Sequence, residues 1–156
     1  MRGLHHLKKI RSIVVKSKYL YYTKIWGMDI DPSCRFSLSA KFDLTHPTGI
    51  HIGAQTYIAF GTAILTHDMT RGLLVDTYIG KRCFIGAHSM ILPGVNVGDE
   101  SIVAAGSIVT KDVPSRCIVA GNPAIIIREN IKVKAYGRFL DADDTEIKCQ
   151  KAIAER

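Results

Sequence analysis

Residues 79–114 read IGKRCF IGAHSM ILPGVN VGDESI VAAGSI VTKDVP when cut into sixes, with no gap between blocks. Each block begins with an aliphatic residue, and a small or β-branched residue follows four positions later. An α-helix has a period near 3.6 residues and a plain strand a period of two, so neither produces this spacing. A strict period of six is typical of a parallel β-helix, in which three blocks make one coil and the aliphatic side chain points to the coil axis.

The same aliphatic position recurs upstream in two other frames. One set of blocks begins at Ile52, Ile58 and Ile64, and a weaker pair begins at Ile30 and Phe36. The frame changes around residues 45–50 and again between residues 69 and 78. We expect a loop to leave the coil at residues 67–78, and such loops usually carry the binding chemistry of a repeat protein.

These patterns predict a mainly β protein of one domain, long enough for a continuous core. Residues 1–29 are expected to form a basic N-terminal helix or cap. The β-helix should occupy residues 30–114, with the extruded loop near 67–78. Residues 115–156 are expected to form an exit loop and a C-terminal extension that becomes helical late, because DADDTEIKCQKAIAER lacks Gly and Pro.

The net charge of +7 is concentrated at the N-terminus, where residues 1–24 hold seven lysines and arginines and no acid. Residues 4–24 are predicted to form a helix with apolar residues near one face. These are Leu4, Leu7, Ile10, Val14 and Leu20. The helix either caps the first coil or lies on a membrane surface. We favour capping, because the end of a solenoid otherwise exposes apolar surface and strand edges, and we favour a solvated charge run over an anionic partner.

The compartment is predicted from the cysteines and the apolar runs. Cys34, Cys83, Cys117 and Cys149 show no C-x-x-C pairing, and two of them occupy the small interior position. Reduced thiols that pack as small hydrophobes favour the cytoplasm over a disulfide framework. The sequence has no run of eighteen apolar residues and no secretory leader pattern, so we expect neither a membrane span nor secretion.

His67 is the candidate for chemistry, because it lies at the start of the extruded loop in T-H-D. An imidazole can accept a proton from a hydroxyl or amine and return it to a leaving thiolate. Asp68 follows it and could orient the ring, although neighbouring residues on an extended chain point in opposite directions. A backbone carbonyl or an acid from another coil is the alternative, and a corner histidine that contacts only solvent is the simplest reading.

Two further patterns allow binding. His46 and His51 could contribute to a zinc site shared between subunits, but Pro47 and the frame change argue against their convergence, and we expect no metal. The run AAGSIVTKD at 104–112 has small residues, which leave backbone amides open to an extended ligand. Lys111 at its end, with Arg128 beyond the exit loop, can meet phosphates.

The stretch IGKRCFIGAHSMILPGVNVGDESIVAAGSIVTKDVPSRCIVAGNPA closely resembles the C-terminal half of hexapeptide-repeat acyltransferases. It is most similar to the sugar O-acetyltransferase branch, which includes maltose, galactoside and polysaccharide O-acetyltransferases. The match covers roughly residues 30–128. The combination of I-G blocks, G-S-I-V-T-K-D-V-P and A-G-N-P-A is highly specific.

This resemblance implies a left-handed parallel β-helix that forms a homotrimer, uses acetyl-coenzyme A and has its sites between subunits. T-H-D matches the place of the family's catalytic histidine, so the resemblance implies that His67 is the base in a direct transfer without an acyl-enzyme. The positions where relatives contact coenzyme A correspond to Ala87, Ala105, Thr110, Lys111 and Arg128. Galactoside-type relatives place an asparagine near the acceptor where this chain has Asp43, so we expect this acid to contact the acceptor or to orient His67.

The function predicted from these residues and the resemblance is acetyl transfer to a sugar hydroxyl, in surface polysaccharide biosynthesis. The same chemistry on an amino group of a nucleotide-linked sugar is the alternative, and a zinc lyase of the carbonic-anhydrase type or a non-catalytic scaffold are other classes. We expect a sugar, glycan or nucleotide-sugar acceptor, no nucleic-acid partner and a possible peripheral membrane contact.

Overall fold

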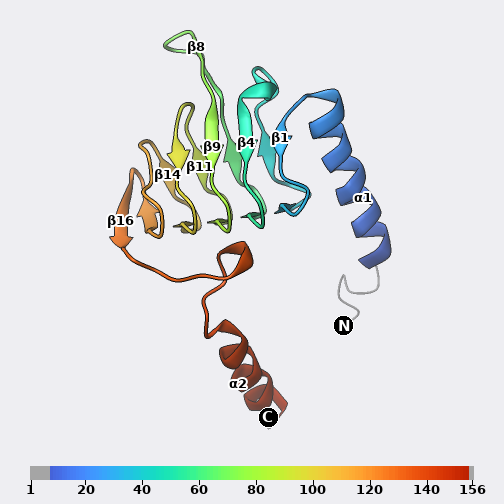
Figure 1. Cartoon of the computed structure of the whole chain (residues 1–156), viewed down its shortest axis with the longest axis vertical. Coiled ribbons are helices and arrows are strands. Elements are labelled where there is room, and N and C mark those ends of the chain that lie inside the picture. The colour runs from blue at the N-terminus through green and yellow to red at the C-terminus, as the bar shows by residue number, and fades with distance from the viewer. Residues whose placement is uncertain (1–7, 155–156) are drawn as a thin grey trace.

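The computed structural model describes residues 8–154 (Figure 1). Helix α1 (Lys8–Leu20) continues as a π-helical turn, η2 (Tyr21–Ile25), and lies at one end of a stack of short strands. The chain finishes in helix α2 (Ala142–Ala154), which projects away from the strands, below them in Figure 1. Among the described residues, no helix is both long and apolar enough to cross a membrane.

The strands form three parallel sheets that the chain visits in turn. Sheet A contains β1 (Asp29–Ile30), β4 (Ile50–Ile52), β9 (Thr77–Ile79) and β12 (Asn96–Val97). Sheet B contains β2 (Arg35–Phe36), β5 (Tyr57–Ile58), β10 (Phe84–Ile85), β13 (Ile102–Val103), β15 (Ile118–Gly121) and an antiparallel edge strand, β16 (Ala124–Arg128). Sheet C contains β3 (Lys41–Phe42), β6 (Ala63–Ile64), β11 (Met90–Ile91) and β14 (Ile108–Val109). This order is consistent with a three-sided β-helix.

The column of aliphatic residues predicted from the six-residue period is buried. Its members are Ile79, Ile85, Ile91, Val97, Val103 and Val109. Each ends a strand whose preceding residue points outward, because successive side chains of a strand alternate between its two faces. The small position is buried as well, and its hydroxyls pair with backbone carbonyls, as Thr56 does with Gly80 at 2.7 Å. The interior therefore holds polar hydroxyls without leaving them unpaired.

The helix differs from its prediction in bounds and in the face that packs. Residues 4–7 lie outside the described residues, and the helical turns extend to Ile25. Tyr22 is buried at the end of the core, with its ring centroid 4.9 Å from that of Phe42, whereas Val14 and Leu20 are exposed. The aromatic residues are the ones that reach the first coil, so Val14 and Leu20 face away from it.

The sheets also extend beyond residue 114, the residue at which the sequence predicts that the β-helix ends. In the six-residue register Val113 falls four positions after the leading Val109. The structure instead pairs it in parallel with Val97, which leads a block, so Val113 also leads one. Val119 follows six residues later in β15, buried and paired with Val103. The coil from Val97 to Val113 is thus shorter than the eighteen-residue coil from Ile79 to Val97 before it, and its frame shift concealed it in the sequence.

The C-terminal extension returns along the strands to the first coil. The backbone N–H of Ile131 donates to Arg116, and that of Tyr136, in the 3-10 turn η4 (Ala135–Gly137), donates to Gln55 at 2.7 Å. The Tyr136 hydroxyl reaches the carbonyl of Ser33, 103 residues away in the chain. Residues 129–139 therefore cover the turns between sheets A and B.

A buried member of the aliphatic column should contribute strongly to stability. We expect Ile91→Ala to lower the free energy of unfolding by about 2–5 kcal/mol, because it removes packed methyl groups and leaves a cavity. Ile127→Ala on exposed β16 should change it by less than about 0.5 kcal/mol. Denaturant titrations followed by circular dichroism measure both. Equal losses would contradict the assignment of the core.

Candidate active site

The candidate active site lies at the corner where the chain passes from sheet C to sheet A. Four segments turn there, one after each strand of sheet C. Two of them are enlarged. The turn after β3 contains the 3-10 turn η3 (Pro47–Gly49), and the segment after β6 leaves the body as a hairpin of β7 (His67–Asp68) and β8 (Leu73–Leu74). The extruded loop expected near residues 67–78 is this hairpin.

His67 begins the hairpin and is half-buried. Its backbone pairs with Leu74 across the two strands. Its backbone N–H donates to Oδ2 of Asp43 on the neighbouring coil at 3.0 Å. The main chain that carries the imidazole is thus held on both sides, which restricts where a general base at this position can act.

Asp43 anchors the backbone of this corner. Its Oδ1 accepts the N–H of Thr45 at 2.9 Å, and its Oδ2 accepts the N–H of Thr66 at 3.2 Å and that of His67. Partial burial opposes ionisation, but the hydrogen bonds from Thr45, Thr66 and His67 outweigh it and lower the pKa of the carboxyl. Both oxygens therefore accept hydrogen bonds from the main chain. Asp43 holds the start of the hairpin, and these contacts do not involve the imidazole.

Asp68 is occupied within the hairpin. Its Oδ1 accepts from the Thr70 hydroxyl at 2.7 Å and from two backbone N–H groups, and its Oδ2 accepts from the Arg71 guanidinium. These hydrogen bonds, first from Thr70 and then from Arg71, lower the pKa of Asp68. This carboxylate therefore stabilises the turn of the hairpin. That role differs from the suggestion that Asp68 could orient the His67 ring.

A network of polar side chains that the sequence did not reveal lies beside this corner. His46 Nε2 lies 3.0 Å from Asp76 Oδ1, and His51 Nε2 lies 3.3 Å from Asp76 Oδ2. The second ring nitrogen of His51 lies 3.2 Å from Asp29 Oδ2. The hydrogen bond from His46 is the main cause that lowers the pKa of Asp76; desolvation opposes it, and the hydrogen bonds from Tyr78 and His51 add to the lowering. The network joins the turn before β4 to the outer face of sheet A.

His46 and His51 therefore converge despite Pro47 and the frame change, but they converge on a carboxylate. Within residues 8–154 as described, no group of three or more His, Cys, Asp or Glu is placed to hold a metal ion. The spacing of five residues between the two histidines therefore correctly indicated that their side chains lie near each other. The partner, Asp76, comes from the far end of the hairpin segment, which the sequence pattern does not align with His46.

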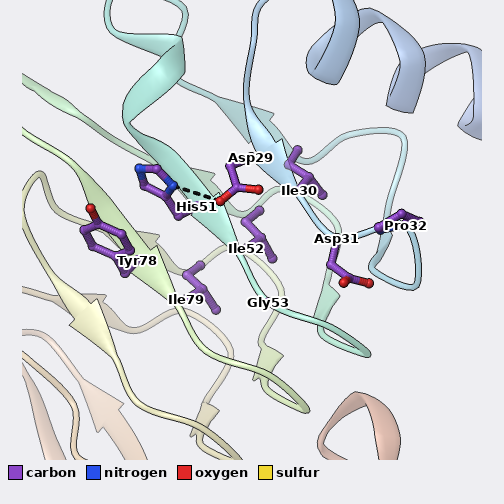
Figure 2. Close-up of a pocket in the computed structure, with 9 residues that line it drawn as sticks. All are labelled: Asp29, Ile30, Asp31, Pro32, His51, Ile52, Gly53, Tyr78 and Ile79. Atoms are coloured by element: carbon purple, nitrogen blue, oxygen red, sulfur yellow. Dashed lines mark hydrogen bonds and ion pairs between the residues drawn. The ribbon is translucent and has the colours of Figure 1, made fainter.

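A shallow pocket of about 460 Å³ opens on the outer face of sheet A (Figure 2). Asp29, His51 and Tyr78 stand on neighbouring strands, and Asp31 lines the pocket from the turn beyond β1. The rings of His51 and Tyr78 stack with centroids 4.4 Å apart at an interplanar angle of 8°. Carboxylate, imidazole and phenol groups on a rigid sheet offer hydrogen bonds suited to a hydroxylated ligand.

The candidate cofactor residues lie in three places on the chain. Ala87 and Ala105 are stacked at the corner between sheets B and C, where the Gly106 N–H donates to the Ala87 carbonyl at 2.8 Å. Thr110 and Lys111 are exposed at the corner between sheets C and A, after β14. Two strand spacings of sheet C, roughly 10 Å, separate that turn from the turn that carries His67. Arg128 ends β16 opposite Ile118 in sheet B.

The titration of Asp43 gives a pH test of the corner. Because its native pKa is depressed, its stabilisation is complete above the ordinary aspartate pKa of about 3.9 and is lost as pH falls through the lower native value. Asp43→Asn retains one acceptor oxygen but cannot ionise. We expect the variant to be less stable than the parent near pH 6, and the difference to shrink as pH falls below the ordinary aspartate pKa, by denaturant titration. Asp144→Asn on α2 controls for loss of a charge, and a difference that does not shrink as pH falls would exclude the anchoring role.

Comparison with known proteins finds the same repeat in other chains. Residues 77–111 match a family model described as the hexapeptide repeat of succinyl-transferase. The chain is 38% identical over 115 residues to the Putative acetyltransferase YvoF of Bacillus subtilis (strain 168), covering 70% of this chain and 64% of that protein. It is 37% identical over 127 residues to Serine acetyltransferase 2 of Arabidopsis thaliana, covering 78% of this chain and 38% of that one.

A solved galactoside acetyltransferase in complex with coenzyme A superposes with a TM-score of 0.52 at 25% identity, covering 78% of this chain and 77% of that structure. The chain spans less than two thirds of the length of the two curated relatives, at 64% and 38%. The repeat, the sheets and the matched proteins agree. Residues 77–111 carry the hexapeptide repeat of that family, and the relatives to which the chain is similar are acetyltransferases.

Proposed function

We propose that the chain is an acyltransferase that moves an acetyl group from acetyl-coenzyme A to a sugar hydroxyl, with His67 as general base. The observation that carries the proposal is the anchoring of His67 by Asp43 at the corner that also bears Lys111. A base with an anchored backbone, at a turn two strand spacings or roughly 10 Å from the turn that bears Lys111, suits an extended phosphorylated cofactor. The similarity to a galactoside acetyltransferase with bound coenzyme A supports this substrate pair.

The reaction follows from the chemistry of an imidazole. His67 takes the proton of the acceptor hydroxyl as the oxygen attacks the thioester carbonyl. The tetrahedral adduct collapses, its carbon–sulfur bond breaks, and the imidazolium returns the proton to the leaving thiolate. No acyl-enzyme forms, because the two substrates react directly with each other. A backbone N–H group that faces the thioester would stabilise the oxyanion.

Coenzyme A would lie across the corners that bear the candidate residues. Ala87 and Ala105 leave room for the pantetheine chain beside approachable backbone amides. Lys111 and Arg128 would contact the adenosine phosphates, and Thr110 would offer a hydroxyl between them. Galactoside-type relatives have an asparagine at the position of Asp43. Because both oxygens of Asp43 accept hydrogen bonds from the main chain, we propose that it affects the acceptor indirectly, by holding the start of the hairpin in place.

We further propose a left-handed, closed β-helix that assembles as a homotrimer with sites between subunits. The three sheets differ in what their outer faces present. Sheet A bears the polar network, and residues 129–139 cover the turns that lead to sheet B. Sheet C presents Ala63, Met90 and Ile108, which are half-buried in the single chain. An apolar face of this kind suits a subunit contact, and closed cyclic symmetry is the usual outcome for such chains.

Surface polysaccharide or a precursor of it is the acceptor class that we propose, and the cytoplasm is the proposed location. The buried thiols support a reducing compartment, because burial raises the pKa of Cys83 to about 11 and keeps it an unreactive, packed thiol.

Removal of the base should abolish most transfer without unfolding the chain. We expect His67→Ala to lower the rate of coenzyme A thiol release by about 100- to 10,000-fold, the usual contribution of a general base. Met69→Ala serves as a matched control, because Met69 is 82% exposed on the same hairpin, and it should stay within about twofold of the parent. Thiol release with acetyl-coenzyme A and a panel of sugars, nucleotide sugars and glycolipids measures both.

The panel and a metal analysis separate the competing functions. Full activity in His67→Ala would move the chemistry to another group. Transfer only to amino sugars would replace O-acetylation by N-acetylation on the same base. Stoichiometric zinc in the purified protein would favour a lyase and end the transferase proposal.

The phosphate contact of Lys111 makes a separate prediction. Lys111→Ala should weaken coenzyme A binding about three- to tenfold at low salt, and the difference should shrink as salt screens the exposed charge. Calorimetric titration at two ionic strengths measures it. An unchanged dissociation constant at both would exclude this role for Lys111, while leaving the role of His67 open to its own test.

A further inference from the structure

We propose that the outer face of α1 and η2 docks on an anionic lipid surface. This outer face consists of exposed large apolar and aromatic residues together with two exposed lysines. The apolar members are Ile13, Val14, Leu20, Tyr21 and Ile25, and the lysines are Lys16 and Lys24.

The rotation of the helix is fixed by contacts on its inner side. Tyr22 is buried against Phe36 and Phe42, and the Tyr19 hydroxyl donates to the Ile30 carbonyl at 3.0 Å. The Lys18 ammonium points inward as well and donates to the Leu38 carbonyl at 2.6 Å. Because these contacts hold one side of the helix against the first coil, the opposite side must face away from the chain.

That opposite side is unusually apolar. Ile13 is 66% exposed and Ile25 is 72% exposed, and the other three apolar members are also exposed. A helix that caps a soluble body normally presents polar residues outward, so five exposed large apolar residues on the outer side indicate a further contact. An aromatic residue such as Tyr21 among aliphatic ones is common where a helix lies in a lipid headgroup region.

The charge selects the occupant. Residues 1–24 carry seven basic residues and no acid, and Lys16 and Lys24 are exposed beside the apolar members. Anionic lipid satisfies both features, because acyl chains receive the apolar residues while headgroups attract the lysines. A second copy of the same face would bring lysines together. A nucleic acid would engage the lysines but leave the apolar residues in water.

The position of the helix supports this docking. Figure 1 shows α1 at the end of the strand stack that is opposite β16. The next step rests on the proposed trimer. Rotation about a single axis preserves direction along that axis, so three copies of α1 at one end of the assembly would meet the same surface, and their affinities would combine. A lipid-linked acceptor would then be concentrated near the enzyme.

Co-sedimentation of the full chain with lipid vesicles tests the proposal. We expect binding to phosphatidylcholine vesicles that contain about 30% phosphatidylserine, much weaker binding to pure phosphatidylcholine, and release as salt rises. Lys16→Gln with Lys24→Gln should weaken binding about 25-fold, or about fivefold for each lysine. Ile13→Ser with Ile25→Ser should weaken it at least about tenfold. Ile125→Ser, on β16 and 65% exposed, is the control and should bind like the parent.

Other outcomes would overturn the proposal. Equal binding to neutral and anionic vesicles, or equal binding of all variants, would exclude this face as the contact. Loss of assembly mass in light scattering for Ile13→Ser with Ile25→Ser, without loss of vesicle binding, would assign the face to a second copy. Tight binding to duplex DNA with no vesicle binding would assign it to nucleic acid. Circular dichroism would check that each variant is folded. The vesicle assay needs no acetyl transfer, so failure of the lipid-docking proposal is distinct from failure of the proposed function.

Discussion

The structure depends on a parallel hydrogen-bonded ladder that holds one aliphatic side chain of each strand toward a common axis. Ile85 is paired on both sides, with Ile58 in the coil before and Val103 in the coil after, and the N–H of Gly86 donates to the Val103 carbonyl at 2.8 Å. A Cβ on Gly86 would lie 2.5 Å from the Ala105 nitrogen, so the coils approach as closely as backbone allows. Each corner is consequently set by the coils above and below it.

This ladder explains how a reactive corner can be built without weakening the body. The hairpin that begins at His67 leaves after Ile64 and returns at Thr77, and both of these residues keep their partners in neighbouring coils. The pairing of His46 with Asp76 leaves no room for a side chain at position 49, since a Cβ there would lie 2.5 Å from the His46 ring of the same turn and 2.9 Å from Asp76 Oδ1. Asp43 and Asp76 then tie the two turns to each other and to sheet A.

The parts that were predictable from the sequence are those governed by the six-residue period. The aliphatic column that runs from Ile79 to Val109 is buried, as the period requires. The change of frame also correctly put T-H-D at the start of the extruded segment. Periodicity could not show which side of α1 packs, because Val14 and Tyr22 are both apolar enough for burial and only the aromatic rings reach the first coil. It also failed at Val113, where the coil shortens, and at Asp76, which lies in the second frame change while its partner His46 lies in the first. Contacts between insertions depend on how each loop folds, which a repeat does not encode.

The return of residues 129–139 changes how such a molecule can come apart. In a simple stack of repeats each unit touches only its neighbours, so terminal units can fray independently. Here Tyr136 links Ser33 and Gln55 to a segment that is also bonded to Arg116. Loss of either end therefore loosens contacts at the other, and the array gains cooperativity that nearest-neighbour stacking alone does not give. The same long-range closure raises the contact order, which is expected to slow folding in return for a body that opens as one unit.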